Sequence, residues 1–136
     1  MRVALIAFID KPDRRVQNIM QKMANAAASK GNQVDAINGN EDLVNTRLTV
    51  YDYIAVCTRP QGLFGGKLPR RISDFLATSG TISGKKGCAL VLKSGFSSAK
   101  TCKNLMKALE AEGLMLDYFD IVGDEDHAAL VGKKIG

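Results

Sequence analysis

The stretch RVALIAFI at residues 2–9, followed at once by DKPD at residues 10–13, decides the fold. A short apolar run that ends in turn residues is typical of a strand buried on both faces of a sheet. From Arg14 the period changes to that of a helix. The residues that share its apolar face are Val16, Ile19, Met20, Met23 and Ala27. Gly31 supplies a left-handed stop, so a buried strand leads directly into an amphipathic helix.

The alternation of strand and helix continues along the chain. Apolar runs predict further strands at residues 34–37, 53–57, 88–92 and 114–122. Between them we expect a brief helix capped by Asn40 that carries Leu43, Val44 and Leu48, a helix that begins near Pro69, and a helix that ends at Gly113. A short last helix is expected around residues 128–133, with a weak apolar stripe. This order predicts one α/β domain over residues 1–136, a doubly wound parallel sheet between two layers of helices.

Composition narrows the class of protein. Of the 136 residues, 46% are hydrophobic and 24% are charged, which is near the average for globular domains. No apolar run approaches the roughly 20 residues that cross a bilayer, and no signal peptide is recognisable, so a cytoplasmic protein is expected. The net charge of +5 favours an anionic ligand or partner without naming it.

The reactive side chains form no recognisable catalytic or metal-binding pattern. Cys57, Cys88 and Cys102 lie in apolar strands or on the apolar face of a helix, so we interpret them as core residues. His127 has no nucleophile at an evident spacing and is expected to lie alone on the surface. The acidic residues between positions 117 and 126 lack a cation-loop signature and are interpreted as a solvated strand end.

Ligands of open α/β sheets bind beyond the carboxyl ends of the strands. Three loops leave these ends, at residues 10–13, 58–67 and 93–98. In the second loop, glycines permit close backbone approach and Leu63 and Phe64 offer a surface for a flat ring, although a plain connection explains the same residues. In the third loop, Phe96 precedes Ser97 and Ser98, which serve equally well as caps of the next helix.

Two runs of basic residues start at this edge. The runs consist of Arg59, Lys67, Arg70 and Arg71, and of Lys93, Lys100, Lys103 and Lys107. Neither run contains an acidic residue. Solvated surfaces explain such runs, but two runs that converge would focus a positive field at a cleft.

The stretch YDYIAVCTRP at residues 51–60, followed by Gly62 and the Gly65–Gly66 pair, resembles the third strand and flavin-ring loop of the flavodoxin-like family. The segment SGF at residues 94–96 is similar to the family's second ring-contacting loop. The resemblance implies a five-stranded parallel sheet of order 2-1-3-4-5 and an FMN cofactor. The residues that it assigns to the cofactor are Thr58, Arg59, Pro60, Gln61, Gly62, Leu63, Phe64, Gly65, Gly66, Ser94, Gly95 and Phe96, with Lys11 and Arg14 as candidate phosphate contacts.

The first loop departs from the family's pattern. Flavodoxins carry Thr/Ser-x-Thr-Gly-x-Thr there, and its hydroxyls and amides enclose the FMN phosphate at a helix N-terminus. This chain has DKPD, without glycine or hydroxyl, and Pro12 removes an amide donor. Asp13 is interpreted as the N-cap of the first helix. We therefore predict that FMN is bound weakly.

Two functions follow as hypotheses. The first is a flavodoxin-like protein that binds FMN weakly for electron transfer or flavin-dependent reduction, which as an enzyme would be an oxidoreductase. The second is a binding or regulatory module without cofactor, whose basic edge meets an acidic protein or another anionic ligand. The partner expected across the two hypotheses is a redox or an acidic protein. Nucleic acid ranks third, because the basic runs lack interleaved aromatic residues and no nucleic-acid motif occurs. The weak last helix predicts an uncovered patch of sheet and therefore a homodimer.

Overall fold

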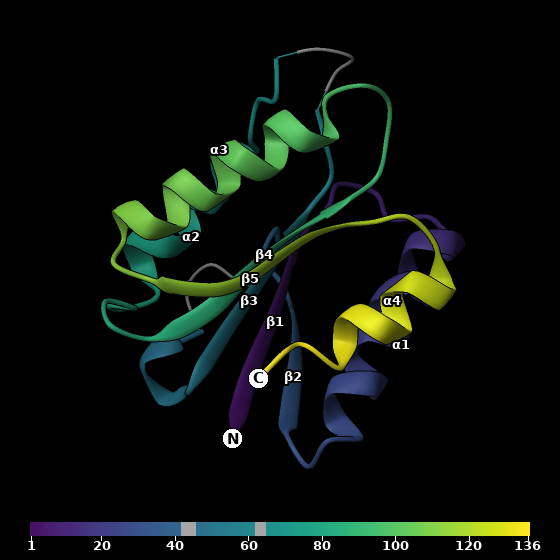
Figure 1. Ribbon diagram of the computed structural model, residues 1–136. Coiled ribbons are helices and arrows are strands. Elements are labelled where there is room, and N and C mark those ends of the chain that lie inside the picture. Colours follow the sequence, from purple (N-terminus) through teal and green to yellow (C-terminus); the bar gives the residue numbers. More distant parts are fainter. Residues whose placement is uncertain (42–45, 62–64) are drawn as a thin grey trace.

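A computed structural model describes residues 1–41, 46–61 and 65–136 (Figure 1). Its strands are β1 (Arg2–Phe8), β2 (Gln33–Asn38), β3 (Tyr53–Thr58), β4 (Lys86–Leu92) and β5 (Met115–Val122). All neighbouring strands pair in parallel, and their order in the sheet is β2-β1-β3-β4-β5. The predicted flavodoxin-like sheet is confirmed.

Helices cover both faces of this sheet. The helices are α1 (Arg14–Ala28), α2 (Arg70–Thr78), α3 (Ser98–Ala111) and α4 (Glu125–Gly132). Figure 1 shows α2 and α3 over one face and α1 and α4 over the other. The loops at the carboxyl ends of β1, β3 and β4 gather at one edge, away from both chain termini. The predicted three-layer arrangement is therefore confirmed.

Each face of the sheet has its own hydrophobic core. In β1, Val3 and Leu5 pack toward α1 and α4, whereas Ala4 and Ile6 pack toward α2 and α3. The other two central strands, β3 and β4, are buried in the same way on both faces. This is the physical reason for their unbroken apolar runs, because neither set of alternating side chains faces water.

The brief helix predicted after β2 lies mostly outside the described residues. Residues 42–45, which include Leu43 and Val44, lie outside the described residues. Leu48 is buried and begins a 3₁₀ turn, Leu48–Val50. Asn40 lies in a turn where its backbone N–H donates to Oδ1 of Asn38. The described part of this connection is therefore held by an Asx turn of Asn38.

The last helix packs more closely than its sequence indicates. Ala128, Val131 and Ile135 are buried in the core between α1 and the sheet. Gly132 meets α1 so closely that an added Cβ would lie 2.4 Å from the carbonyl oxygen of Met23. The part of the sheet beneath α4 is therefore covered, and self-association stays a prediction.

Candidate functional site at the carboxyl edge of the sheet

A direct contact joins the first two loops at this edge. The guanidinium of Arg59, at the end of β3, donates through Nη2 to the carbonyl oxygen of Asp10, at a distance of 3.1 Å. Below it, the buried hydroxyl of Thr58 donates to the carbonyl oxygen of Phe8, at 2.9 Å. Thr58 is thus used to join β3 to β1, whereas Arg59 lies at the surface where a ligand can reach it.

A hollow of about 330 Å³ lies between these two loops. Its lining consists of Phe8, Ile9, Asp10, Lys11, Arg59, Pro60 and Gln61. Lys11 is exposed and adopts a left-handed backbone conformation with φ 47°. Two cationic side chains and one carboxylate therefore line an open hollow directly above β1 and β3, the position at which ligands bind in open α/β sheets.

A second hollow, of about 500 Å³, adjoins the first on the side of α2. It shares Phe8, Asp10 and Gln61 with the first hollow and adds Asn40, Pro69, Arg70, Arg71 and Asp74. Arg71 donates through Nη2 to the carbonyl oxygen of Asn40, and its buried Nε has no hydrogen-bond partner among the described residues. Two arginines and two carboxylates, Arg70, Arg71, Asp10 and Asp74, therefore line this second hollow.

The glycine-rich loop is fixed at both ends of its described part. Gln61 and Lys67 form an antiparallel bridge at its base. Asn104 of α3 donates through Nδ2 to the carbonyl oxygen of Gly66, and an added Cβ on Gly66 would lie 2.8 Å from the carbonyl carbon of Lys100. Gly66 therefore permits close backbone approach to α3, and its contact with a ligand stays a prediction. The predicted ring contacts Gly62, Leu63 and Phe64 lie outside the described residues.

The loop after β4 presents Phe96 to solvent, with 84% of its surface exposed. Gly95 precedes it with φ 61°. Ser97 occupies the N-cap of α3 but makes no capping hydrogen bond with its side chain. The Ser98 hydroxyl instead accepts from the N–H of Ser94 and donates to the carbonyl oxygen of Ser94. Ser97 therefore lies at the predicted cap position without capping through its side chain, and the Ser98 side chain closes the loop on itself instead.

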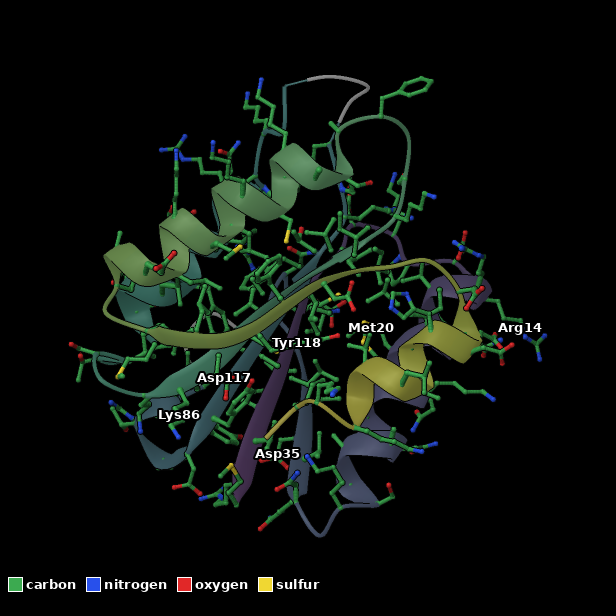
Figure 2. All side chains as sticks on the ribbon, in the orientation of Figure 1. Arg14, Met20, Asp35, Lys86, Asp117 and Tyr118 are labelled. Atoms are coloured by element: carbon green, nitrogen blue, oxygen red, sulfur yellow. The ribbon has the colours of Figure 1, made fainter. Side chains whose placement is uncertain are left out.

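The N-terminus of α1 does not fit a buried phosphate. Asp13 caps this helix as predicted, since its carboxylate accepts from the N–H of Val16 at 2.9 Å. A negative charge of the chain thus occupies the place that a phosphate would take. Arg14 points away from the sheet (Figure 2) and is not part of the lining of the hollow, whereas Lys11 is. Arg15 donates to the carbonyl oxygen of Gly123.

A hydrogen-bonded cluster lies at the end of β5, and the sequence pattern does not indicate it. Tyr118, labelled in Figure 2, donates to Oδ2 of Asp120 at 2.6 Å, and Nε2 of His127 lies 3.2 Å from the same oxygen. Nδ1 of His127 accepts from the N–H of Gly123, which assigns the proton of a neutral ring to Nε2. The expectation that His127 is alone is therefore wrong. Since both ring nitrogens are engaged, the cluster joins β5 to α4 and offers no free base.

The cluster gives the protein an acid-sensitive contact. Partial burial raises the pKa of Asp120, but hydrogen bonds from Tyr118 and from the N–H of Ile121, together with His127, outweigh it, and the pKa is lowered. The contact therefore stabilises the fold above the ordinary carboxyl pKa and is lost as pH falls through the lower folded value. We expect Asp120→Asn to lower the free energy of unfolding at neutral pH by about 1 kcal/mol.

Urea unfolding over a series of pH values checks this prediction. The difference between Asp120→Asn and the parent chain should shrink as the pH falls below 3.8, the ordinary value of this carboxyl group. Asp126→Asn, at an exposed position of α4, is the matched control. A difference that stays constant down to the acid limit would show that the charge of Asp120 contributes nothing.

The buried reactive groups are held in unreactive forms. Cys57, Cys88 and Cys102 are free and buried, and burial raises the pKa of Cys88 to about 12. The hydroxyl of Tyr53 donates to Oδ1 of Asp117 at 2.5 Å, and its pKa is raised, chiefly by burial. Among the described residues, no group of three metal-ligating side chains occurs and no helix has the length and apolarity to cross a membrane. The interpretation of the cysteines as core residues is confirmed.

Comparison with known proteins places the fold. No protein-family model and no curated protein matches the sequence. Among solved structures, flavodoxin 1 from Bacillus cereus aligns with a TM-score of 0.70 and 17% identity over 97% of this chain and 95% of that one. A flavodoxin variant from Pseudomonas aeruginosa aligns with 0.74 and 13% identity over 98% and 95%. An NADH:FMN oxidoreductase in its apo form aligns with 0.70 and 11% identity over 96% and 84%.

Proposed function

We propose that this flavodoxin-like chain binds FMN weakly at the carboxyl edge of its sheet, for electron transfer or flavin-dependent reduction. The observation that carries the proposal is the hollow above β1 and β3, with Lys11 and Arg59 in its lining. The ring would lie toward the loops that contain Pro60, Gly65 and Phe96, and the phosphate near Lys11 and Arg59. A bound flavin supplies the redox chemistry, while the protein supplies orientation and electrostatics.

The proposed binding is weak because the usual phosphate cradle is replaced. The carboxylate of Asp13 occupies the N-terminus of α1, and Pro12 has no backbone N–H that could donate to a phosphate. Exposed lysine and arginine side chains interact with an anion at high dielectric, where each contact contributes roughly 1 kcal/mol or less. The phosphate should therefore add little to the affinity for the ring, and FMN should bind only about tenfold more tightly than riboflavin.

Titration of the flavin-free protein with FMN and with riboflavin, followed by flavin fluorescence, tests the proposal. We expect both flavins to be quenched, and Lys11→Glu to weaken FMN binding about threefold to tenfold while leaving riboflavin binding unchanged. Lys22→Glu, at an exposed position of α1, controls for the change in net charge. Absence of quenching with both flavins would exclude the flavin function.

The cap at Asp13 favours a second candidate, a module without cofactor that binds an acidic partner through the basic edge. Arg70 is exposed beside the second hollow, and it forms no ion pair with a described carboxylate. This function predicts association that weakens as ionic strength rises and that is lost on charge reversal at Arg70 and Arg71. A chain that fails to quench flavins and still shows this association supports the second function over the first.

A further inference from the structure

A groove separates α3 from the edge strand β5, away from the hollows described above. It has a volume of about 250 Å³ and is lined by Ala99, Cys102, Lys103, Met106, Phe119, Asp120 and Ile121. Phe119 stands at its rim with 58% of its surface exposed, and Met106 is half-buried in its wall. Phe119 and Met106 thus extend the apolar surface of the groove, which an apolar side chain of a partner could occupy.

The edge strand itself is closed to further strand pairing. In the ladder with β4, Cys88 pairs with Tyr118 and the preceding pair is Gly87 with Leu116, so Asp117 forms a bulge. The N–H of Ile121 donates to Oδ1 of Asp120, at 2.8 Å. A bulge and a locally satisfied N–H both interrupt the row of donors and acceptors that an added strand needs. A partner must therefore bind through side chains in the groove.

The charges beside the groove select the kind of partner. Lys100, Lys103 and Lys107 are exposed at a spacing of three and four residues, so they form one stripe along α3. None of them forms an ion pair with a described carboxylate. The carboxylate in the groove, Asp120, already accepts from Tyr118 and lies against His127. The stripe therefore places positive charge without a described ion-pair partner along the α3 side of the groove, while Asp120 lines its β5 side.

A second copy of this chain fits the groove poorly. A symmetric contact would bring the lysine stripes of both copies near each other, and like charges close together oppose association. An acidic partner gains from the same stripe. A helix with apolar residues at i, i+3 or i+4 and i+7 matches a groove that runs beside a helix, and carboxylates on its flank would face the lysines.

We propose that the groove between α3 and β5 binds an acidic amphipathic helix of another protein. The apolar stripe of the partner helix contacts Phe119 and Met106, and the carboxylates of that helix pair with Lys103 and Lys107. This interaction does not depend on flavin binding, because none of the residues lining the groove lines the two hollows at the carboxyl edge.

A fluorescently labelled helical peptide with a leucine stripe and glutamate at its other positions is the probe, and fluorescence anisotropy with flavin-free protein is the measurement. We expect saturable binding that weakens as salt is raised. Lys103→Glu/Lys107→Glu should weaken binding at least about tenfold, and Phe119→Ser about tenfold. Lys22→Glu and Leu130→Ser are the matched controls, since both positions are exposed on the other face of the sheet and Leu130 is 63% exposed.

Two comparisons separate the proposal from its alternatives. A peptide of the same composition without the leucine stripe should bind at least about tenfold more weakly, because the groove requires an apolar face. Equal binding of both peptides, equal loss in the control variants, or no binding of the acidic peptide would overturn the proposal. Sedimentation that shows a dimer of the parent chain, abolished by Phe119→Ser, would overturn it in favour of a second copy.

Discussion

Gly132→Val is expected to lower the free energy of unfolding by about 3 kcal/mol, the upper end of the range for overpacked interfaces. The added Cβ would lie 2.4 Å from the carbonyl oxygen of Met23 and 2.6 Å from Cβ of Ala26, so α4 cannot keep its position against α1. Because Ala128, Val131 and Ile135 reach the core through this helix, its displacement exposes apolar surface. Urea unfolding followed by circular dichroism measures the loss.

Leu130→Val is the matched control for this prediction. It places the same β-branched residue in the same helix, at a position that is 63% exposed, and therefore reports the effect of helix propensity alone. The expected cost of the control is within about 0.5 kcal/mol. If both variants lose the same stability, the close contact between α1 and α4 contributes nothing.

The same contact explains what the sequence could and could not predict about the fold. The central strands were predictable because burial on both faces makes every position apolar, as in β3 and β4. The helix α4 was underestimated because it meets α1 closely at Gly132, which has no side chain and therefore adds nothing to the periodic hydrophobicity of the sequence. From the sequence alone, small residues indicate little about the core, because their close contact with a partner helix is seen only in the structure.

At the candidate site, local interactions were predictable and interactions between distant segments were not. The cap at Asp13 depends only on residues within one turn of α1, and it was predicted. The bond from Arg59 to the carbonyl oxygen of Asp10 joins residues 49 positions apart. These positions follow from the register of the sheet. The residue pattern predicts the alternation of strands and helices, but it does not predict that register.

Replacement of the first loop should convert weak flavin binding into tight FMN binding. The variant Asp10→Ser/Pro12→Gly/Asp13→Thr removes two carboxylates, restores an amide donor and places a hydroxyl at the N-cap of α1 in place of the Asp13 carboxylate. Hydrogen bonds to a charged group contribute about 1.5 to 3 kcal/mol each. Two new donors to the phosphate are therefore expected to lower the dissociation constant of FMN about a hundredfold.

Riboflavin separates this effect from a general opening of the loop. It has the same ring without the phosphate, so its affinity should change less than about threefold in the variant. Circular dichroism and urea unfolding establish that the variant is folded, since glycine in place of proline should cost about 1 kcal/mol or less. An equal gain for both flavins would show that Asp10, Pro12 and Asp13 restrict access to the ring. No gain for either would show that the replaced side chains do not contact the phosphate, and would leave Lys11 and Arg59 as its only proposed partners in the hollow.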